Sequence, residues 1–493
     1  MSKSFDCDLL VVGLGPAGDA LAALASTQGL SVIAIDQAPA LFALPRAAVF
    51  DHEIMRIFQM IGVAERIRPV CRVPDRYQFV TADGDVLLDF PVAKVGPYGW
   101  AETYALHQPA VEQVLRDRLG ELDVDVQLGV AFQSCVQDAE GVDVVVKDDR
   151  GSRSIRARYV VGCDGAWSPV RELLGVGLDD YQFDEPWLVL DTIVEDAGDL
   201  PIVCQQICDP KRPITYMAMS GKRFRWEFML KPGETAEEML ADAKIRELLE
   251  PWNCADRIQI ERKAVYRFHG LVAQRWREGR VLIAGDAAHQ MPPFAGQGMC
   301  SGIRDAANLA WKLAAIVKRN ASDSILDSYQ EEREPHVRAI IGTAIAMGKV
   351  VCMLDERAAA GRNQEMLARK AAGAQDVSVA YPDLTGGILT KTPGAGALFP
   401  QFVSDEGQRM DEAIGDGPVL IGRELPSSSG PDVRLLDLDA AALAPFAEGI
   451  ANWLDERGTP AVLIRPDRHV FGTGTAGDLL SEWQTAVSGR VAA

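Results

Sequence analysis

Three glycine-rich segments hold the residues best suited to bind a ligand through backbone and carboxylate groups. Residues 13–18 read GLGPAG, residues 164–165 read DG, and residues 285–299 read GDAAHQMPPFAGQGM. Glycine leaves backbone N–H groups open to a ligand, a helix N-terminus favours a phosphate, and a carboxylate favours hydroxyl groups. The longest segment combines these features, so it suits a ligand that has hydroxyls, a phosphate and an electron-rich ring.

The elements around the first segment predict a dinucleotide site. A short apolar run precedes GLGPAG, a helical pattern follows it, and a second apolar run at 31–35 ends at Asp36. In this arrangement Gly13 makes the tight turn, Gly15 lets a pyrophosphate approach, and Gly18 allows the helix to pack on the strand. Asp36 lies where a carboxylate binds ribose hydroxyls. The fingerprint by itself does not distinguish NAD from FAD.

The other two segments also follow apolar runs that predict buried strands. One run, at 159–162, leads into Asp164, and the other, at 281–284, leads into Asp286. A helical pattern then starts near Met299. Each feature alone also occurs in an ordinary strand–loop–helix corner, and only their combination in one run favours a ligand site.

Together the three segments resemble the flavin motifs of the class A flavoprotein monooxygenases, a family that includes p-hydroxybenzoate hydroxylase. The resemblance implies that Asp286 binds the ribityl chain of FAD, that Asp164 helps to seat this chain, and that residues 293–299 lie beside the isoalloxazine ring. The complete set of cofactor contacts that it implies is Gly13, Gly15, Gly18, Asp36, Arg46, Gln108, Asp164, Asp286, Gly296, Gly298 and Met299.

Three of the candidate residues also have a simpler interpretation. Arg46 follows the second strand, and it is either a solvated surface charge or, as in the resembled family, a residue near the flavin and its phosphates. Gln108 precedes a predicted helix that has Pro109 in its first turn, and it is either a flavin contact or a solvated helix-start glutamine. His52 lies in a helical pattern at 51–61, as a core or surface histidine or as an active-site residue.

A predicted sheet between residues 183 and 268 is expected to form the wall that holds the substrate over the flavin. Residues 223–230 alternate, so that three aromatic side chains point one way and three charged side chains the other. We expect the aromatic face to line the pocket, and the alternative is that it is plain core. The residues expected at the reacting ring are Arg46, His52, Tyr216, Trp226 and Pro293.

Composition narrows the class of protein and its partners. The chain has 493 residues and a formal charge of −20, which argues against nucleic acid or an anionic membrane as a partner. No apolar run approaches the roughly 20 residues of a membrane span, and the first apolar run is too short for a signal peptide. Nine cysteines are scattered without metal-ligand spacing. We therefore expect reduced thiols, no metal site and a cytoplasmic location.

The expected fold class combines α/β and α+β: a Rossmann-like FAD-binding domain, an inserted β-sheet substrate domain and a C-terminal thioredoxin-like domain. The tail resembles a thioredoxin fold in the order of its elements, but it has no cysteine, so we exclude a thiol redox role and expect packing or a homodimer contact. The expected divisions are 1–182 and 276–350 for the FAD-binding domain, 183–275 for the substrate domain with a hairpin added from near 75–100, 351–407 for a helical linker, and 408–493 for the tail.

Local sequences narrow the resemblance further. CDPKRP, RWEFMLKPGE, MPPFAGQGM, SGIRDAANLAWKL and YQEER resemble the 3-(3-hydroxyphenyl)propionate hydroxylase branch. That branch hydroxylates a phenol ortho to its hydroxyl with NADH, FAD and O2, through a flavin C4a-hydroperoxide. Only one dinucleotide fold is evident, so NADH or NADPH is expected to bind transiently. The chain departs from the family pattern at Asp19, and no anchor for a substrate carboxylate can be identified.

The leading hypothesis is therefore a single-component aromatic hydroxylase of phenol catabolism that acts on 3-(3-hydroxyphenyl)propionate or a related phenol. A tailoring hydroxylase that acts on a polyketide-type phenol is the nearest alternative. An alternative of another class is a flavin-bound sensor without turnover, which NADH oxidation stimulated by a phenol would distinguish from an enzyme.

Overall fold

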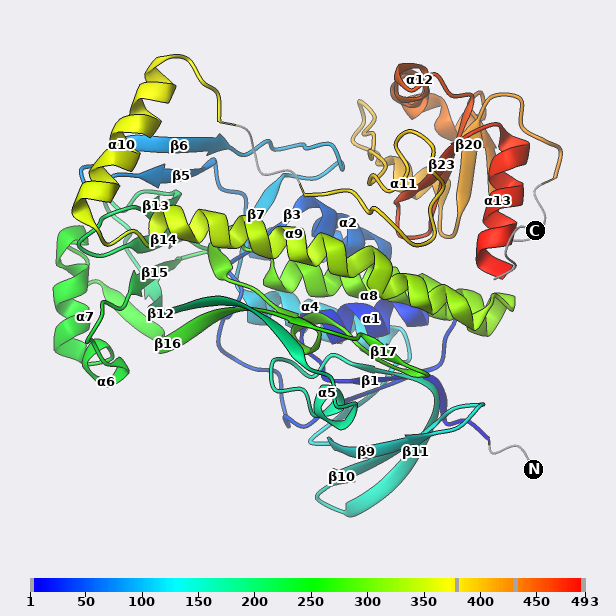
Figure 1. Cartoon of the computed structure of the whole chain (residues 1–493), viewed down its shortest axis with the longest axis horizontal. Helices are drawn as coiled ribbons and strands as arrows, with labels where there is room; N and C mark the ends of the chain where they lie inside the picture. The colour runs from blue at the N-terminus through cyan, green and yellow to red at the C-terminus, as the bar shows by residue number, and fades with distance from the viewer. Residues whose placement is uncertain (1–3, 377–380, 429–432, 489–493) are drawn as a thin grey trace.

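The computed structural model describes residues 4–376, 381–428 and 433–488, and it arranges them as two large sheets, two small sheets and the helices around them (Figure 1). Residues 377–380 belong to the expected linker, and residues 429–432 and 489–493 belong to the expected tail. What the sequence predicts at those positions lies outside the described residues.

The first large sheet brings the three motifs to one edge. Strands β18, β11, β1, β2 and β8 run parallel in that order. The motifs follow β1, β11 and β18, which are neighbours, so all three meet at the carboxyl ends of adjacent parallel strands. The strands of this sheet are β1 (Cys7–Val12), β2 (Val32–Asp36), β8 (Asp125–Leu128), β9 (Ala131–Gln137), β10 (Val142–Asp148), β11 (Gly151–Gly162), β17 (Arg277–Glu278) and β18 (Val281–Ile283). These bounds confirm the four strands expected beside the motifs.

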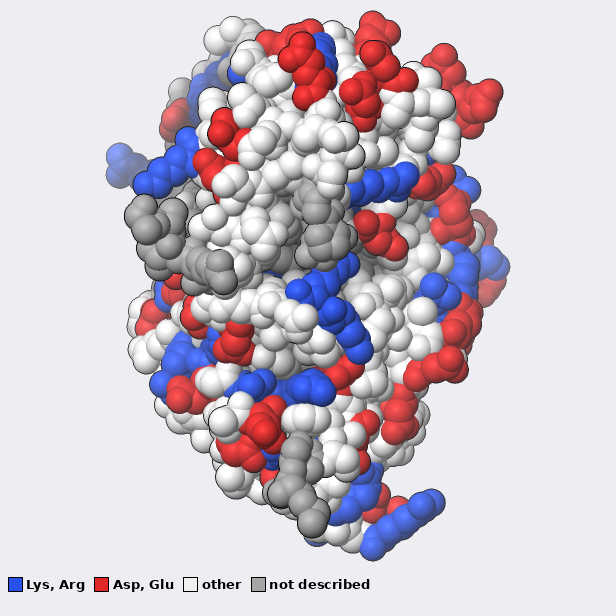
Figure 2. All heavy atoms as spheres, turned by 90° about the vertical axis from the view of Figure 1, so that its right-hand side faces the viewer, with Lys and Arg blue, Asp and Glu red and all other residues white. Residues whose placement is uncertain are grey.

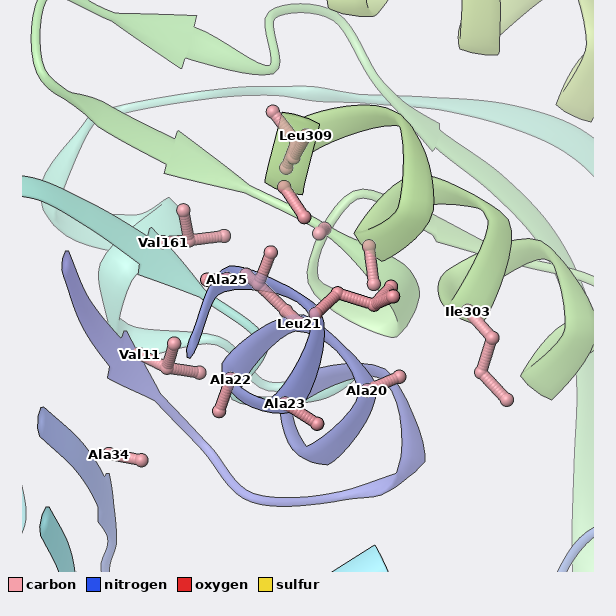
Figure 3. Close-up of a cluster of buried hydrophobic side chains, with 14 of the residues drawn as sticks. Val11, Ala20, Leu21, Ala22, Ala23, Ala25, Ala34, Val161, Ile303 and Leu309 are labelled. Atoms are coloured by element: carbon pink, nitrogen blue, oxygen red, sulfur yellow. The ribbon is translucent and has the colours of Figure 1, made fainter. Parts of the chain in front are cut away.

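Helix α1 (Pro16–Thr27) packs between this sheet and the long helix α8 (Gly298–Arg319). Figure 3 shows α1 between the strands that carry Val11 and Val161 on one side and α8 on the other. The α1 residues in this core are mostly alanines with no exposed surface, which lets the helix approach the strands closely. The approach fixes the start of α1 against the GLGPAG turn.

The second large sheet has the order β19-β16-β12-β15-β14-β13-β5-β6. The hairpin β5–β6 joins it through a parallel pair between β13 and β5. Strand β19 belongs to the third motif and pairs with β16, so it ties the two large sheets together. The strands are β5 (Arg76–Val80), β6 (Val86–Pro91), β12 (Leu178–Val194), β13 (Cys204–Ile207), β14 (Ile214–Ala218), β15 (Arg223–Met229), β16 (Ile258–Ala273) and β19 (His289–Gln290).

The remaining helices of the main body surround these sheets, and a small sheet of order β3-β7-β4 contacts the end of β14 in the second one, where Arg72 donates to the Met219 carbonyl oxygen at 2.8 Å. The region expected as loose helix and linker contains a regular helix, α10, which packs along β6. The elements are α2 (His52–Ile61), α3 (Ala64–Ile67), α4 (Gln108–Glu121), α5 (Pro169–Leu173), α6 (Ala236–Met239), α7 (Asp242–Leu249), α9 (Asp327–Val351), α10 (Glu356–Ala371), β3 (Val49–Asp51), β4 (Cys71–Arg72) and β7 (Thr103–Leu106).

Within the described residues no single helix is long and apolar enough to cross a membrane. One bent pair of helical segments, Asp323–Val351 and Glu356–Ala371, satisfies the length and composition test jointly, with an angle of 109° between them.

The C-terminal unit is a four-stranded sheet of order β21-β20-β22-β23 with helices packed on it. Strand β20 is a four-residue buried run that the sequence analysis did not predict. The core of this unit also includes Phe399, which precedes the expected boundary at 408. The elements are α11 (Met410–Ile414), β20 (Val419–Gly422), β21 (Arg434–Asp437), α12 (Ala447–Glu456), β22 (Ala461–Ile464), β23 (Val470–Gly474) and α13 (Ala476–Ser488).

Buried charges and stacked rings attach this C-terminal unit to the main body. Arg465 pairs with Glu332 of α9 at 2.7 Å, and the ring of Trp483 stacks on Trp311 of α8 at 5.9 Å between centroids. The unit therefore packs on α8 and α9, the helices that follow the third motif. The surface of the molecule on this side carries both acidic and basic side chains, mixed with one another (Figure 2).

Candidate active site

One cavity of about 810 Å³ runs from the edge where the three motifs meet to the inner face of the second large sheet. Most of the residues expected from the sequence surround it, although they come from distant parts of the chain. The expected residues that line it are Gly13, Gly15, Asp36, Arg46, His52, Gln108, Asp164, Asp286, Pro293, Gly296, Gly298 and Met299. Three expected residues do not line it: Gly18, Tyr216 and Trp226.

The three glycines of the first motif have different surroundings. A Cβ on Gly13 would lie 2.5 Å from the Cys163 carbonyl oxygen, and one on Gly18 would lie 2.0 Å from the Gly13 carbonyl oxygen. No atom lies within 4 Å of the Cβ position of Gly15, which lines the cavity. Gly13 and Gly18 therefore serve close packing of the backbone, and Gly15 leaves space at the N-terminus of α1.

Two of the three motif carboxylates are already held by the chain. The Asp36 carboxylate accepts hydrogen bonds from the Leu14 N–H at 2.7 Å and the Ala38 N–H at 2.8 Å. The Asp164 carboxylate accepts from the Ser168 hydroxyl at 2.5 Å and from the first turn of α5. These contacts fix the turns after β2 and β11, so Asp164 serves its own turn before it serves any ligand.

Asp286 is the carboxylate that remains available. It lines the cavity, and among the described residues it has no hydrogen-bond or ion-pair partner. Its side chain is exposed, and the surface that it exposes lines the cavity. Burial raises the pKa of Asp286, while the charges of His289 and Arg46 act in the opposite direction. A ligand with hydroxyl groups would satisfy this carboxylate.

The chain segment at Arg46 is clamped by hydrogen bonds from two sides. The Gln108 side-chain oxygen accepts from the Arg46 N–H at 3.2 Å and from the Ala47 N–H at 2.5 Å. Arg225, from the second sheet, donates to the Arg46 carbonyl oxygen at 2.9 Å. Gln108 thus positions the Arg46 segment, a role that sequence reasoning did not foresee. The exposed Arg46 guanidinium lies over the ring of Phe42 at the cavity.

The N-terminus of α2 presents His52 to the cavity. Asp51 caps this helix, accepting from the Glu53 N–H at 3.0 Å, and it pairs with Arg304 of α8 at 2.5 Å. Burial alone would raise the pKa of Asp51, but the charges of Arg304 and His52 keep it below its ordinary value. Burial lowers the pKa of His52, so its imidazole is neutral near pH 7. The His52 Nδ1 atom is buried and has no hydrogen-bond partner.

The loop at 293–299 presents backbone to the cavity. Gly296 has φ 65°, and a Cβ there would lie 2.4 Å from Val49 of β3, so both conformation and space require glycine. The Tyr77 hydroxyl donates to the Phe294 carbonyl oxygen at 3.3 Å. These contacts fix the loop between the small sheet and the second large sheet.

The expectation that Tyr216 and Trp226 line the pocket is wrong. Both side chains have no exposed surface, and their rings lie 5.3 Å apart in a core on the outer face of the sheet, under the segment that contains Trp252. The alternation of β15 places Arg225 and Glu227 on the inner face instead. The sequence identified the two faces of the strand but not which one meets the cavity, because α7 and the residues after it cover the aromatic side.

Sequence reasoning also missed the ionic groups on that inner face. Arg225 pairs with Asp191 of β12 at 2.7 Å, and Arg262 of β16 lies 3.6 Å from the same carboxylate. Glu227 lies 3.6 Å from Arg225. The signal in the sequence was a strand in which charged residues alternate with aromatic ones. Such a pattern indicates a face that is neither exposed to solvent nor part of an apolar core.

The unusual Asp19 has a structural partner at the first motif. Asp19 is fully buried in α1, and its carboxylate lies 2.7 Å from Nε of Arg116. Arg116 also donates to the Leu14 carbonyl oxygen and lines the cavity. Asp19 therefore holds a cation beside the GLGPAG turn, where a phosphate would lie.

Comparison with known proteins identifies the family. Residues 6–344 match the family described as FAD binding domain. The chain is 40% identical over 490 residues to the probable NADH-specific resorcinol 4-hydroxylase of Rhodococcus jostii (strain RHA1), across 94% of this chain and 91% of that protein. The chain belongs to the FAD-dependent aromatic hydroxylases. The class A resemblance inferred from the three motifs is thereby confirmed.

One further relative and one solved structure are also similar to this chain. A 3-(3-hydroxy-phenyl)propionate/3-hydroxycinnamic acid hydroxylase of Mycolicibacterium gilvum (strain PYR-GCK) is 37% identical over 377 residues, which cover 75% of this chain and 65% of that protein. The crystal structure of aklavinone-11 hydroxylase with FAD and aklavinone matches with a TM-score of 0.79 over 99% of this chain and 100% of that chain, at 22% identity. The latter likeness is one of fold.

The cavity of this aromatic hydroxylase fits FAD. Open space at Gly15 meets the N-terminus of α1, Arg116 lies at the same turn, and Asp286, which has no partner among the described residues, lines the same cavity. These groups match a diphosphate and a polyhydroxyl chain, in that order. Among the residues that the structure describes, no group of three or more His, Cys, Asp or Glu side chains is placed to hold a metal ion.

Proposed function

We propose that the chain hydroxylates a phenol at a ring carbon ortho to a hydroxyl group, with NADH as reductant and O2 as oxygen donor. The observation that carries this proposal is the continuous cavity, which joins the three motifs to a polar wall on the second sheet. One relative that aligns along 94% of the chain, at 40% identity, is named for NADH and resorcinol, which supports NADH and a dihydric phenol. We place such a phenol ahead of 3-(3-hydroxyphenyl)propionate, which the sequence alone favours.

The residues proposed to hold FAD follow the length of the cavity. The diphosphate would lie against Gly15 and Arg116, the ribityl chain against Asp286, and the ring against residues 293–299. Bound FAD supplies the hydride acceptor and the site at which O2 is activated. Asp36 and Asp164 are proposed to support FAD binding mainly by holding in place the turns that follow β2 and β11.

The chain itself must position the phenol and accept its proton, because a phenolate is the more electron-rich ring. His52 is the proposed acceptor, since it lines the cavity and its lowered pKa keeps it neutral. Arg46 is proposed to guide the flavin ring, because its segment is fixed to both the substrate wall and α4. Pro293 begins the 3-10 turn Pro293–Ala295 beside the proposed ring site and keeps the preceding residue, Pro292, extended.

Several finer expectations remain proposals that the fold supports. We infer that the small C-terminal sheet is a thioredoxin-like module without cysteines, and that the divisions between domains follow the expected boundaries except that this module includes Phe399, ahead of 408. All nine cysteines are free, in accord with the proposed cytoplasmic location. A homodimer remains a prediction that size-exclusion chromatography with light scattering would test.

The test measures NADH oxidation by the FAD-loaded protein with resorcinol, phenol and 3-(3-hydroxyphenyl)propionate, followed by product identification under ¹⁸O2. We expect NADH oxidation to be slow without a phenol and fast with resorcinol. The expected product is benzene-1,2,4-triol that contains one labelled oxygen. Equal rates with and without every phenol, with hydrogen peroxide as the only product, would refute the proposal.

A further inference from the structure

Arg225 is a buried cation whose hydrogen bonds to the protein are incomplete. It is 2% exposed, its Nε donates to Asp191 at 2.7 Å, and its Nη1 donates to the Arg46 carbonyl oxygen at 2.9 Å. Its Nη2 is buried without a hydrogen-bond partner, and the residue lines the cavity. A buried guanidinium donor without an acceptor is unfavourable, so this atom calls for an acceptor that the ligand brings.

Glu227 lies beside this donor on the same strand. It is 7% exposed, lines the cavity, and lies 3.6 Å from Arg225 Nη1. Burial raises its pKa, the charge of Arg225 opposes this, and Asp191, Thr215 and Arg262 are its other polar neighbours. The wall therefore offers the cavity one fixed donor and one carboxyl group side by side.

The chemistry of this pair fits a hydroxyl group better than a carboxylate. A hydroxyl both donates and accepts, so it satisfies Glu227 and Arg225 at the same time. A carboxylate accepts only, and it would lie against the Glu227 carboxyl, where two negative charges in one site are unfavourable. A ring without a second polar group would leave the Nη2 donor of Arg225 without an acceptor.

We propose that Arg225 and Glu227 form a subsite for a second hydroxyl group on the aromatic ring, so that the preferred substrates are dihydric phenols. This assignment rests on the proposed function, phenol hydroxylation. Arg225 accepts the added task without losing its contact to the Arg46 segment, because that contact uses a different nitrogen. A hydroxyl bound in the subsite thus completes the hydrogen bonds of Arg225, which already donates to the Arg46 segment proposed to lie near the flavin.

The test compares the dissociation constants of phenol and resorcinol, measured on FAD-loaded protein through the change in flavin absorbance. We expect the wild type to prefer resorcinol about ten-fold or more, the loss expected when a hydrogen bond to a charged group is missing. Glu227→Leu should bring the ratio close to one, and Glu227→Gln, which keeps an acceptor, should retain most of the preference. Glu261→Leu is the control, since Glu261 lies on the same sheet outside the cavity lining.

A ratio that Glu227→Leu leaves unchanged would overturn the subsite, as would a Glu227→Gln variant that loses the preference as fully as the leucine variant does. Tighter binding of 3-(3-hydroxyphenyl)propionate than of resorcinol by the wild type would also overturn it. Oxygen incorporation from ¹⁸O2 into any phenol by the wild type keeps the proposed function intact in each of these cases. Its absence with every phenol would instead refute the proposed function.

Discussion

Replacing Glu332 by alanine is expected to lower the free energy of unfolding by about 3 kcal/mol. Glu332 lies on α9 with no exposed surface, and its carboxylate joins three parts of the chain. It pairs with Arg465 of the C-terminal unit at 2.7 Å and with Lys312 of α8 at 3.0 Å. It also accepts a hydrogen bond from the Ile388 N–H at 2.9 Å. Alanine leaves both buried cations without this partner.

The magnitude follows from two independent estimates. Burial alone would raise the pKa of Glu332, but Arg465 and Lys312 lower it from 4.5 to about 2. At 1.36 kcal/mol per pKa unit this difference corresponds to about 3 kcal/mol. Removing one member of a buried ion pair typically costs about 3–5 kcal/mol. We favour the lower figure, because burial lowers the pKa of Lys312 to about 8, so this lysine can release its proton once Glu332 is gone.

The pH dependence has a definite sign. Because the folded-state pKa of Glu332 is depressed, its contribution is complete above the ordinary carboxyl pKa of 4.5 and is lost as pH falls towards about 2. The part of the difference in unfolding free energy between wild type and Glu332→Ala that comes from the Glu332 carboxylate should therefore shrink as pH falls below 4.5.

Urea unfolding followed by tryptophan fluorescence measures the effect, since Trp311 and Trp483 stack at this same contact. The control is Asp455→Ala, which removes an exposed pair with Arg423 and should change the stability far less, because solvent screens such a pair. The double variant Glu332→Ala with Lys312→Met should be less destabilised than the sum of its single changes, because it removes one stranded charge. A loss for Glu332→Ala no larger than that of the control would refute this reasoning.

Three further outcomes are expected. Asp286→Ala should weaken FAD binding about ten- to a hundred-fold in a fluorescence titration, the loss of one charge-assisted hydrogen bond, and an unchanged titration would reject its proposed role. Arg46→Ala should reduce the stimulation of flavin reduction by a phenol, measured by stopped-flow with NADH, more than it reduces FAD affinity. A variant that loses FAD affinity but keeps the stimulation would show that Arg46 only binds the cofactor. A chain that ends before Gln408 should have a lower Tm, because Arg56 loses its ion pair with Asp411 and Glu332 loses Arg465, and an unchanged Tm would contradict the packing role.

The strands and helices beside the motifs could be predicted from the sequence, because short stretches of neighbouring residues determine them. Short apolar runs end in glycine and aspartate, and these residues tolerate or make the turns that start α1 and follow β11 and β18. The order of strand, GxGxxG, helix and acid then indicated a dinucleotide, and the two later motifs indicated a flavin enzyme. The structure adds that these motifs follow neighbouring parallel strands, which is why they share one cavity.

Which of the three motif carboxylates is available to a ligand could not be predicted from the sequence. Asp36, Asp164 and Asp286 look equivalent in the sequence, since each follows an apolar strand. Their hydrogen-bond partners separate them: two hold the backbone of their turns, and only Asp286 faces the cavity without a partner in the described chain. Such a difference depends on side-chain orientation, which the pattern of residue types does not fix.

The sequence by itself thus determined the family, the cofactor class and the order of the elements, because glycine conformations, apolar periodicity and motif spacing act over short stretches of chain. Only the tertiary structure decided which face of β15 meets the cavity and which groups complete the site. Arg225 reaches the Arg46 carbonyl oxygen across 179 positions of sequence, and Tyr216 and Trp226 are turned away into core. Strand alternation is symmetric between the two faces, so the covering helices and the neighbouring domain, not the strand, select the one that meets the cavity.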